Sequence, residues 1–95
     1  MPAYFIADVH VTDHETYDDY KRQVGPQIAK FGGRFLVRGG NPVVLEGSWR
    51  PNRVVVIEFP NKEAITAWYN SPEYAPLIVL RQSAATNHLI AVDGA

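Results

Sequence analysis

The chain contains no cysteine, and this absence excludes several classes of function at once. Without a thiol there is no disulfide framework, no thiolate catalysis and no cysteine-ligated zinc site. Long apolar runs are missing too, since none approaches the roughly 20 residues that span a bilayer. The first residues, Met1-Pro2-Ala3-Tyr4, lack the basic and apolar regions of a signal peptide. We therefore expect a soluble protein of the cytoplasm.

The chain also lacks a marked excess of positive or negative charge. The 95 residues include 9 Lys and Arg against 10 Asp and Glu, which leaves a formal net charge of −1. Nucleic acids and anionic membranes attract proteins through concentrated positive charge. The composition therefore predicts neither a nucleic-acid partner nor a membrane partner.

Cofactor and metal motifs are missing as well. His10 and His14 are four residues apart, but an expected strand-to-helix boundary separates them, and zinc requires three well-placed ligands. Neither Gly32-Gly33 nor Gly39-Gly40 opens a helix or continues into a phosphate-binding motif. We expect no metal site and no cofactor.

What the sequence does contain is a strongly β-forming segment, Arg53–Phe59, between Pro51-Asn52 and Pro60-Asn61. Its centre, Val54–Ile57, is apolar without alternation, which is typical of a strand that is buried on both faces. A chain this short covers one face of a sheet with its own helices and little more. The segment therefore favours a partner molecule on the other face.

Breaker residues divide the rest of the chain into further strands and helices. The expected strands are Tyr4–Val11, Arg34–Arg38, Val43–Glu46, Val54–Phe59 and Asn87–Val92. Helices are expected to begin at the capping residues Thr12, Asn61 and Ser71.

The first helix has the clearest signals. Thr12 and Glu15 have the spacing of a capping box, and an apolar stripe that begins at Tyr17 follows at helical spacing. Gly25-Pro26 lies inside that stripe and predicts a kink or a restart. In the third helix Pro72 stands at the first helical position, and Pro76 is expected to delay the regular part.

This order of elements predicts an α+β domain over residues 1–95. Strand, helix, strand with a hairpin extension, strand, helix pair and strand form a ferredoxin-like βαββαβ domain with an antiparallel sheet. Helices would cover one face only. The other face would carry apolar residues unsuited to water, namely Ile6, Leu36, Val54, Val56 and Ile90. We therefore predict a homodimer with the two sheets face to face.

Several segments also resemble a known family. They are Phe35-Leu36-Val37-Arg38-Gly39-Gly40, Leu45-Glu46-Gly47-Ser48-Trp49, Val56-Ile57-Glu58-Phe59-Pro60 and Ala67-Trp68-Tyr69-Asn70-Ser71-Pro72-Glu73-Tyr74, together with Arg81. In this order they are similar to the bacterial family called domain of unknown function 1330. The resemblance implies the dimeric α/β-barrel superfamily, which includes cofactor-free monooxygenases, muconolactone isomerase and haem-dependent enzymes. It implies no activity for the family itself.

Four polar residues are expected to meet at one end of the sheet. In the ferredoxin-like order, Asp8 and His10 at the end of the first strand lie near His88 at the start of the last strand, and Arg38 ends the second strand at the same edge. His10 or His88 could move a proton near neutral pH, while Arg38 and Asp8 bind a substrate. The alternative is a set of salt bridges at the rim or in the dimer interface.

Glycine and tryptophan residues near this cluster also have two interpretations. Gly39-Gly40 either lets a ligand or a partner backbone approach Arg38, or simply allows positive φ in a loop while Arg38 pairs with a carboxylate. Trp68 either lines a substrate pocket or belongs to the core. Trp49, in a turn, favours an anchor across the dimer, and Arg81 is expected to serve the helix dipole or a carboxylate.

The leading function hypothesis is a cofactor-free enzyme, an isomerase or a monooxygenase, for a small anionic or aromatic metabolite. The competing hypothesis is a non-catalytic dimer that binds a small molecule or has a structural role. Whether the protein is an enzyme stays open at the level of the sequence.

Overall fold

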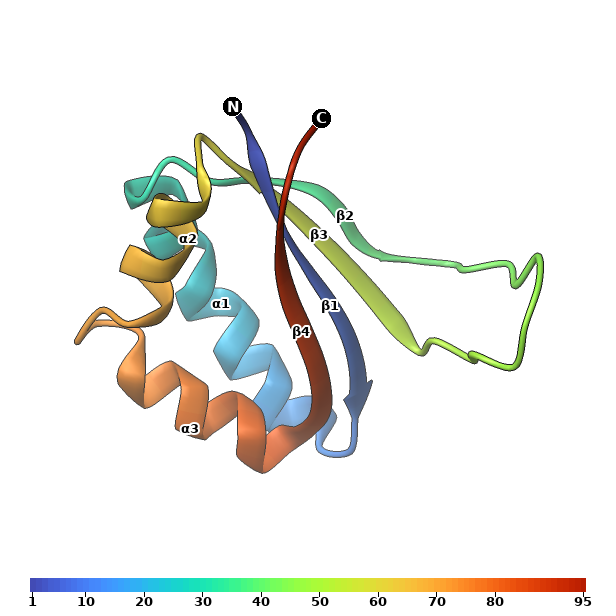
Figure 1. Ribbon diagram of the computed structural model, residues 1–95. Coiled ribbons are helices and arrows are strands. Elements are labelled where there is room, and N and C mark those ends of the chain that lie inside the picture. The colour runs from blue at the N-terminus through green and yellow to red at the C-terminus, as the bar shows by residue number, and fades with distance from the viewer.

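The computed structural model describes residues 1–95, and its strands and helices follow the βαββαβ order (Figure 1). In chain order they are β1 (Ala3–Val11), α1 (His14–Lys30), β2 (Arg34–Gly40), β3 (Arg53–Phe59), α2 (Lys62–Tyr69), α3 (Ala75–Ala84) and β4 (Ala85–Asp93). The strands form one antiparallel sheet in the order β2-β3-β1-β4. The helices lie against one face of the sheet (Figure 1). The predicted ferredoxin-like α+β fold is confirmed.

Strict alternation along β1 and β3 separates the two faces of the sheet. Phe5, Ala7 and Val9 of β1, and Val55 and Ile57 of β3, are buried beneath the helices. Their neighbours in the sequence face the other way, because successive side chains of a strand point to opposite faces. The face away from the helices is called the open face below.

The open face is apolar, as predicted. Leu36 is 46% exposed and Ile90 is 59% exposed, while Ile6, Val54 and Val56 are only partly buried. Leaving such a surface in contact with water is unfavourable.

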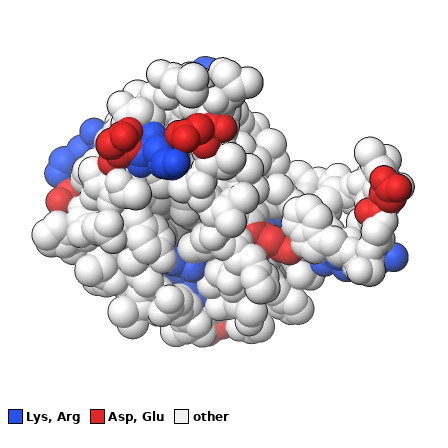
Figure 2. Space-filling model, in the orientation of Figure 1, with Lys and Arg blue, Asp and Glu red and all other residues white.

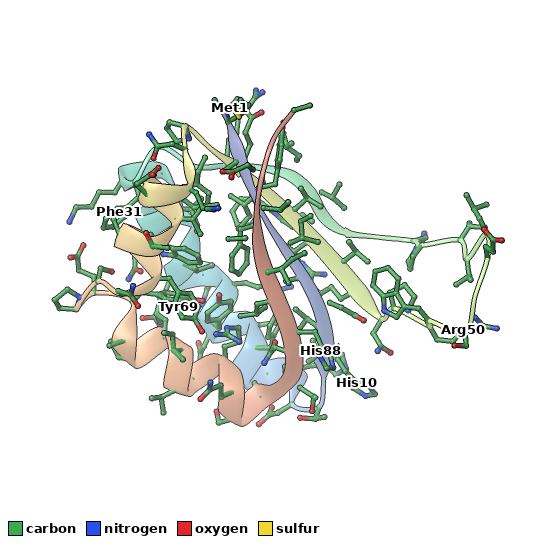
Figure 3. All side chains as sticks on the ribbon, in the orientation of Figure 1. Met1, His10, Phe31, Arg50, Tyr69 and His88 are labelled. Atoms are coloured by element: carbon green, nitrogen blue, oxygen red, sulfur yellow. The ribbon has the colours of Figure 1, made fainter.

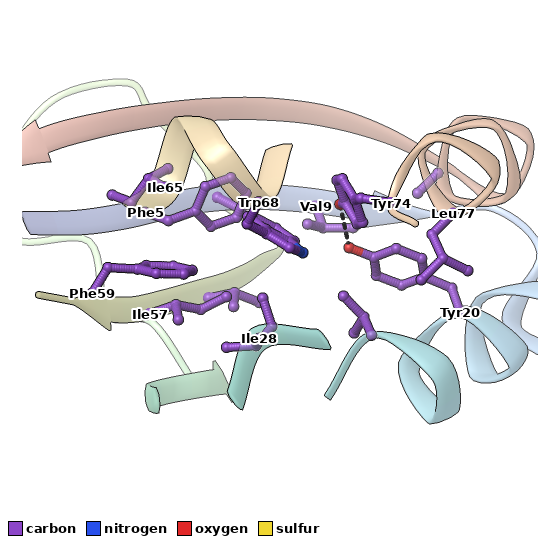
Figure 4. Packing of buried hydrophobic residues seen from close by; sticks show 14 of the residues in the cluster. Phe5, Val9, Tyr20, Ile28, Ile57, Phe59, Ile65, Trp68, Tyr74 and Leu77 are labelled. Carbon is purple, nitrogen blue, oxygen red and sulfur yellow. Dashed lines mark hydrogen bonds between the residues drawn. The ribbon is translucent and has the colours of Figure 1, made fainter. Parts of the chain in front are cut away.

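The core between helices and sheet is built around Trp68, which has no exposed surface (Figure 4). Its ring lies edge-on to Phe5 with the centroids 5.3 Å apart, stacks on Phe59 at 5.8 Å and meets Tyr74 at 4.2 Å. Aromatic contacts of this kind stabilise the fold beyond the burial of apolar surface. The Trp68 ring therefore packs α2 against β1 and β3.

The first helix is capped one residue later than predicted. Asp13, not Thr12, is the N-cap, and its Oδ1 accepts a hydrogen bond of 3.2 Å from the backbone N–H of Thr16. The Thr12 hydroxyl instead donates to the carbonyl of Ala84 at 3.1 Å. Thr12 is thereby used to join the end of β1 to the end of α3, so it is not free to cap.

Gly25-Pro26 does not restart α1, which is continuous from His14 to Lys30. The residue before a proline normally avoids helical geometry, because its Cβ meets the proline ring. Gly25 has no Cβ, and this removes that contact. Of the two predicted outcomes, a kink or a restart, the restart is wrong.

Of the two capping residues predicted for the later helices, Asn61 begins its helix as expected, whereas Ser71 lies before the regular part of its helix. Asn61 caps α2, since its Oδ1 accepts from the backbone N–H of Ala64 at 2.8 Å. Ser71 also accepts from a backbone N–H, that of Tyr74, at 3.2 Å, but regular α3 starts only at Ala75 with Pro76 in its first turn. The delay expected from Pro76 is confirmed.

The hairpin extension is absent. β2 continues through Gly39-Gly40, and residues 41–52 contain no strand. This segment, called the arm below, projects away from the sheet (Figure 1). Val43 is 79% exposed and Leu45 is 93% exposed. A strand needs a neighbouring backbone to pair with, and within this chain Val43–Glu46 has none.

The two ends of the chain lie side by side (Figure 1). Ala3 pairs with Asp93 across β1 and β4, and the N–H of Gly94 donates to the carbonyl of Pro2 at 2.8 Å.

None of the helices combines the length and apolar character required to cross a membrane.

Candidate functional site

A bulge in β2 decides which face of the sheet Arg38 reaches. Phe35 pairs with Ile57, but Val37 pairs with Val56, so Leu36 is an extra residue. An extra residue shifts the alternation of the residues that follow it. Arg38 consequently pairs with Val55 and lies on the helix side. Its guanidinium carbon is 4.0 Å from the centroid of the Phe35 ring.

The four residues expected to converge are therefore divided between the two faces. Asp8 pairs with His88 across β1 and β4, and these two line a hollow with His10 on the open face. Figure 3 shows His10 and His88 at the same end of the sheet. The convergence of Asp8, His10 and His88 is confirmed, whereas the placement of Arg38 with them is wrong. The bulge is the physical reason.

Within this open-face hollow Asp8 already has partners. Its carboxylate accepts from the indole N–H of Trp49 at 3.0 Å and from the backbone N–H of Asn52 at 2.9 Å. Asp8 thus fixes the base of the arm. The side chains of His10 and His88 form no hydrogen bond or ion pair, and no group of three metal-ligating side chains is assembled.

A second concavity lies between α1, α3 and the helix side of the sheet. It has a volume of about 440 Å³, within the range of small-molecule sites. Its apolar wall includes Phe5, Val9, Phe35, Val55 and Leu89. This helix-side cavity, rather than the polar open-face hollow, has the shape and lining of a ligand site.

Two tyrosines and an arginine form a hydrogen-bonded group beside this cavity. The hydroxyl oxygens of Tyr20 and Tyr74 are 2.7 Å apart (Figure 4). The Nε–H of Arg81 donates to the Tyr74 oxygen at 3.4 Å, and Arg81 is only 3% exposed. Its Nη2 is buried without a hydrogen-bond partner. Tyr20 and Arg81 line the cavity.

Burial controls the protonation of these phenols. Burial raises the pKa of Tyr20 far above its ordinary value, and burial likewise raises the pKa of Tyr74. Moving a phenolate out of water is costly, so both groups keep their protons at neutral pH. They are hydrogen-bond donors rather than bases, and of the two only Tyr20 lines the cavity.

Arg53 reaches the same cavity from the start of β3. Its guanidinium lies 5.7 Å from the centroid of the Tyr17 ring, and its Nε is buried without a partner. A Cβ at Gly39, whose φ is +75°, would collide with the Arg53 guanidinium. The loop explanation of Gly39 is thus correct about positive φ, and within the chain the Arg53 guanidinium occupies the space beside this glycine.

The charges of the cavity wall are unbalanced. Lys21 pairs with Asp18 at 3.2 Å, and Asp18 is the only carboxylate on the wall. None of the five salt bridges involves Arg38, Arg53 or Arg81. The carboxylate partners considered for Arg38 and Arg81 are therefore absent, although Arg81 does lie in the last turn of α3, as a dipole role requires. Figure 2 shows basic atoms between the helices and β4, surrounded by mostly uncharged surface.

Trp68 lies outside both concavities. It is fully buried and lines neither wall, so within the protomer it occupies the core position considered as the alternative to a pocket role. Sequence reasoning missed Tyr20 and Arg53 as cavity residues. Arg81 did have a signal, because it follows Leu77 by four residues on the apolar face of α3.

Comparisons with known proteins agree with this architecture. The family model described as "Domain of unknown function (DUF1330)" matches residues 2–95. A comparison with curated proteins finds no match.

Solved structures share the fold at low sequence identity. A protein of unknown function from Rhodopseudomonas palustris is 22% identical, with 99% of this chain and 82% of that chain covered and a TM-score of 0.82. A dimeric ferredoxin-like protein of unknown function from Jannaschia sp. CCS1 is 11% identical, with 99% and 100% covered and a TM-score of 0.73. SnoaB, a cofactor-independent oxygenase from Streptomyces nogalater, is 14% identical, with 99% and 93% covered and a TM-score of 0.69.

Proposed function

The chain belongs to the domain of unknown function 1330 family, and from this fold and its helix-side cavity we propose a cofactor-free enzyme for a small anionic or aromatic metabolite. The proposed reaction is an isomerisation or an oxygenation. The observation that carries the proposal is the cavity of about 440 Å³, in which an apolar wall surrounds a few hydrogen-bond donors.

The chemistry of the cavity wall supports a substrate that reacts as an anion. Tyr20, Arg38 and Arg81 present hydrogen-bond donors and positive charge to the cavity. Donors fixed in a dry site stabilise an enolate or phenolate more effectively than water does. SnoaB, which shares the fold, is a cofactor-independent oxygenase, and this likeness supports the reaction class only by analogy.

The proposed roles of the remaining site residues follow from the two faces. Arg38 keeps a role in substrate binding, since it lines the cavity. His10, His88 and Asp8 lie in the open-face hollow and would act only on a molecule held between two protomers. Trp68 supports the cavity from the core and has no exposed surface for a substrate.

We also propose that the protein is a homodimer joined through its open faces. The apolar open face supports this assembly, and the neighbour from Jannaschia is described as dimeric. A cytoplasmic location is proposed from the sequence alone.

Binding without turnover is the second candidate, and one observation favours it. The cavity wall carries no histidine, and its one carboxylate, that of Asp18, is paired with Lys21. Such a cavity could store or carry a ligand without converting it.

The test compares the natural chain with a variant whose cavity is filled. Ala7 lines the cavity and is 3% exposed, so Ala7→Phe should occupy the ligand space. With 1-hydroxy-2-naphthoate as probe, we expect amide NMR shifts at Val9, Val55 and Leu89 that disappear in Ala7→Phe. The control Val79→Phe, on the exposed side of α3, should keep them.

Oxygen uptake then separates the two candidates. Uptake by the natural chain above that of Ala7→Phe supports the enzyme, while binding with no uptake or isomerised product supports the non-catalytic binder. No localised shifts at millimolar probe would refute the cavity as a ligand site.

A further inference from the structure

We propose that the ligand of the helix-side cavity carries one carboxylate on a flat aromatic body, and that Arg81 and Tyr20 bind this carboxylate. The inference rests on the proposed function, because it specifies the ligand of the same cavity. It does not depend on whether that ligand is converted or only bound.

Arg81 supplies the first argument. A guanidinium stays charged at every accessible pH, and a buried charge is unfavourable unless it is paired and hydrogen-bonded. Arg81 is 3% exposed, forms no ion pair, and has one bond of 3.4 Å to the Tyr74 hydroxyl. Its position in the last turn of α3 offsets part of this cost through the helix dipole. The buried Nη2 still lacks an acceptor, and a carboxylate oxygen would provide it.

Tyr20 supplies a second donor at the same place. Its oxygen is 2.7 Å from the Tyr74 oxygen, which also accepts from Arg81. When Tyr74 donates its hydrogen to Tyr20, the hydroxyl hydrogen of Tyr20 is free to point into the cavity that Tyr20 lines. One phenol and one guanidinium N–H match the two oxygens of a single carboxylate.

Lys21 and Arg22 on the cavity wall are already ion-paired with Asp18 and Asp19, and the two remaining arginines differ from Arg81 in their surroundings. The Arg38 guanidinium lies over the Phe35 ring, and that of Arg53 lies over the Tyr17 ring. Contact with an aromatic face offsets part of a positive charge, whereas no ring faces the Arg81 guanidinium. A phosphate would need more donors at this one point than Arg81 and Tyr20 offer. The aromatic and aliphatic wall fits the body of the ligand.

Isothermal titration at neutral pH with 2-naphthoate and its neutral isostere 2-naphthamide tests the inference. The natural chain should bind the acid at least about tenfold more tightly than the amide, a typical effect of one charge-assisted hydrogen bond. Arg81→Met should remove this preference while leaving the affinity for the amide within about twofold. Tyr20→Phe should reduce the preference by about fivefold, and it preserves the shape of the core if Arg81→Met does not fold.

Two matched controls accompany these variants. Arg34→Met removes an arginine that pairs with Glu58 outside the cavity, and Tyr69→Phe removes a hydroxyl with no hydrogen bond. Both should keep the full preference.

Each result has a distinct meaning. Equal affinity for acid and amide in the natural chain overturns the carboxylate inference and leaves the cavity as a ligand site. A preference that Tyr20→Phe and Arg81→Met leave unchanged overturns the assignment to these residues. If neither probe binds at millimolar concentration, the proposed function fails together with the inference.

Discussion

At the scale of single residues, Trp68 shows how a side chain that suggests a pocket becomes part of the framework. Its indole meets rings from β1, β3 and the turn before α3. The indole N–H is buried without a hydrogen-bond partner. Trp68 therefore contributes through volume and ring contacts, and its polar atom adds no bond that a substitution would lose.

Two substitutions of Trp68 should therefore differ in their cost to stability. Trp68→Ala should lower the free energy of unfolding by about 4 kcal/mol, because it leaves a large cavity among aromatic rings. Trp68→Phe should cost only about 1–2 kcal/mol, because ring contacts persist and no hydrogen bond is lost. Urea titrations followed by circular dichroism measure both values. Similar costs for the two variants would contradict the conclusion that ring contacts dominate at this position.

At the scale of elements, β2 determines what the cavity contains. The bulge at Leu36 places Val37 on the open face and Arg38 on the cavity side. At the next irregularity Gly39 takes a positive φ, and the space beside it holds the Arg53 guanidinium. Two irregularities in one edge strand thus bring two arginines to the same wall.

Neighbouring glycines in this strand should respond differently to alanine. Gly39→Ala places an alanine at a φ of +75°, and the flexible Arg53 guanidinium would have to move aside, so we expect the backbone strain to lower the unfolding free energy by about 1–2 kcal/mol. Gly40 has no positive φ, and an added Cβ would lie 3.7 Å from Val37, an ordinary contact. Gly40→Ala should therefore change stability by less than about 0.5–1 kcal/mol, or raise it slightly. Thermal unfolding of the two variants checks this, and equal losses would contradict the account.

β2 also illustrates which parts of the structure the sequence could predict and which it could not. Alternation and breaker residues are local signals, and they were sufficient for β1, β3, the helices and the apolar open face. A bulge leaves no such signal, because Leu36 is as apolar as its neighbours and its extra position depends on pairing with β3. The side on which Arg38 lies could not be predicted for that reason. Val43–Glu46 has strand propensity but no partner strand, and the pattern alone could not show this.

At the scale of the whole molecule, the open face is the feature on which the proposed dimer depends. Apolar side chains of β1, β3 and β4 share this face with the open-face hollow. Pressing two such faces together would remove them from water.

Light scattering at micromolar concentration should give twice the protomer mass of 10.6 kDa. Ile90→Glu should shift the mass to that of one protomer, because the carboxylate would be buried in the dimer although position 90 is 59% exposed in the protomer. Val79→Glu, at a residue that is 68% exposed on α3, is the control and should remain dimeric. A single-protomer mass for the natural chain would refute the dimer.

The hydrogen bond between Gly94 and Pro2 also bears on the connectivity of the fold. Because the chain ends are adjacent on β1 and β4 while the arm is exposed, a short linker could join the ends and the chain could be opened within the arm. β4 and β1 would then form a simple hairpin, and the strand order of the sheet would not change. Such a rearranged chain would begin just before β3 and end just after β2. The fold is thus suited to circular permutation.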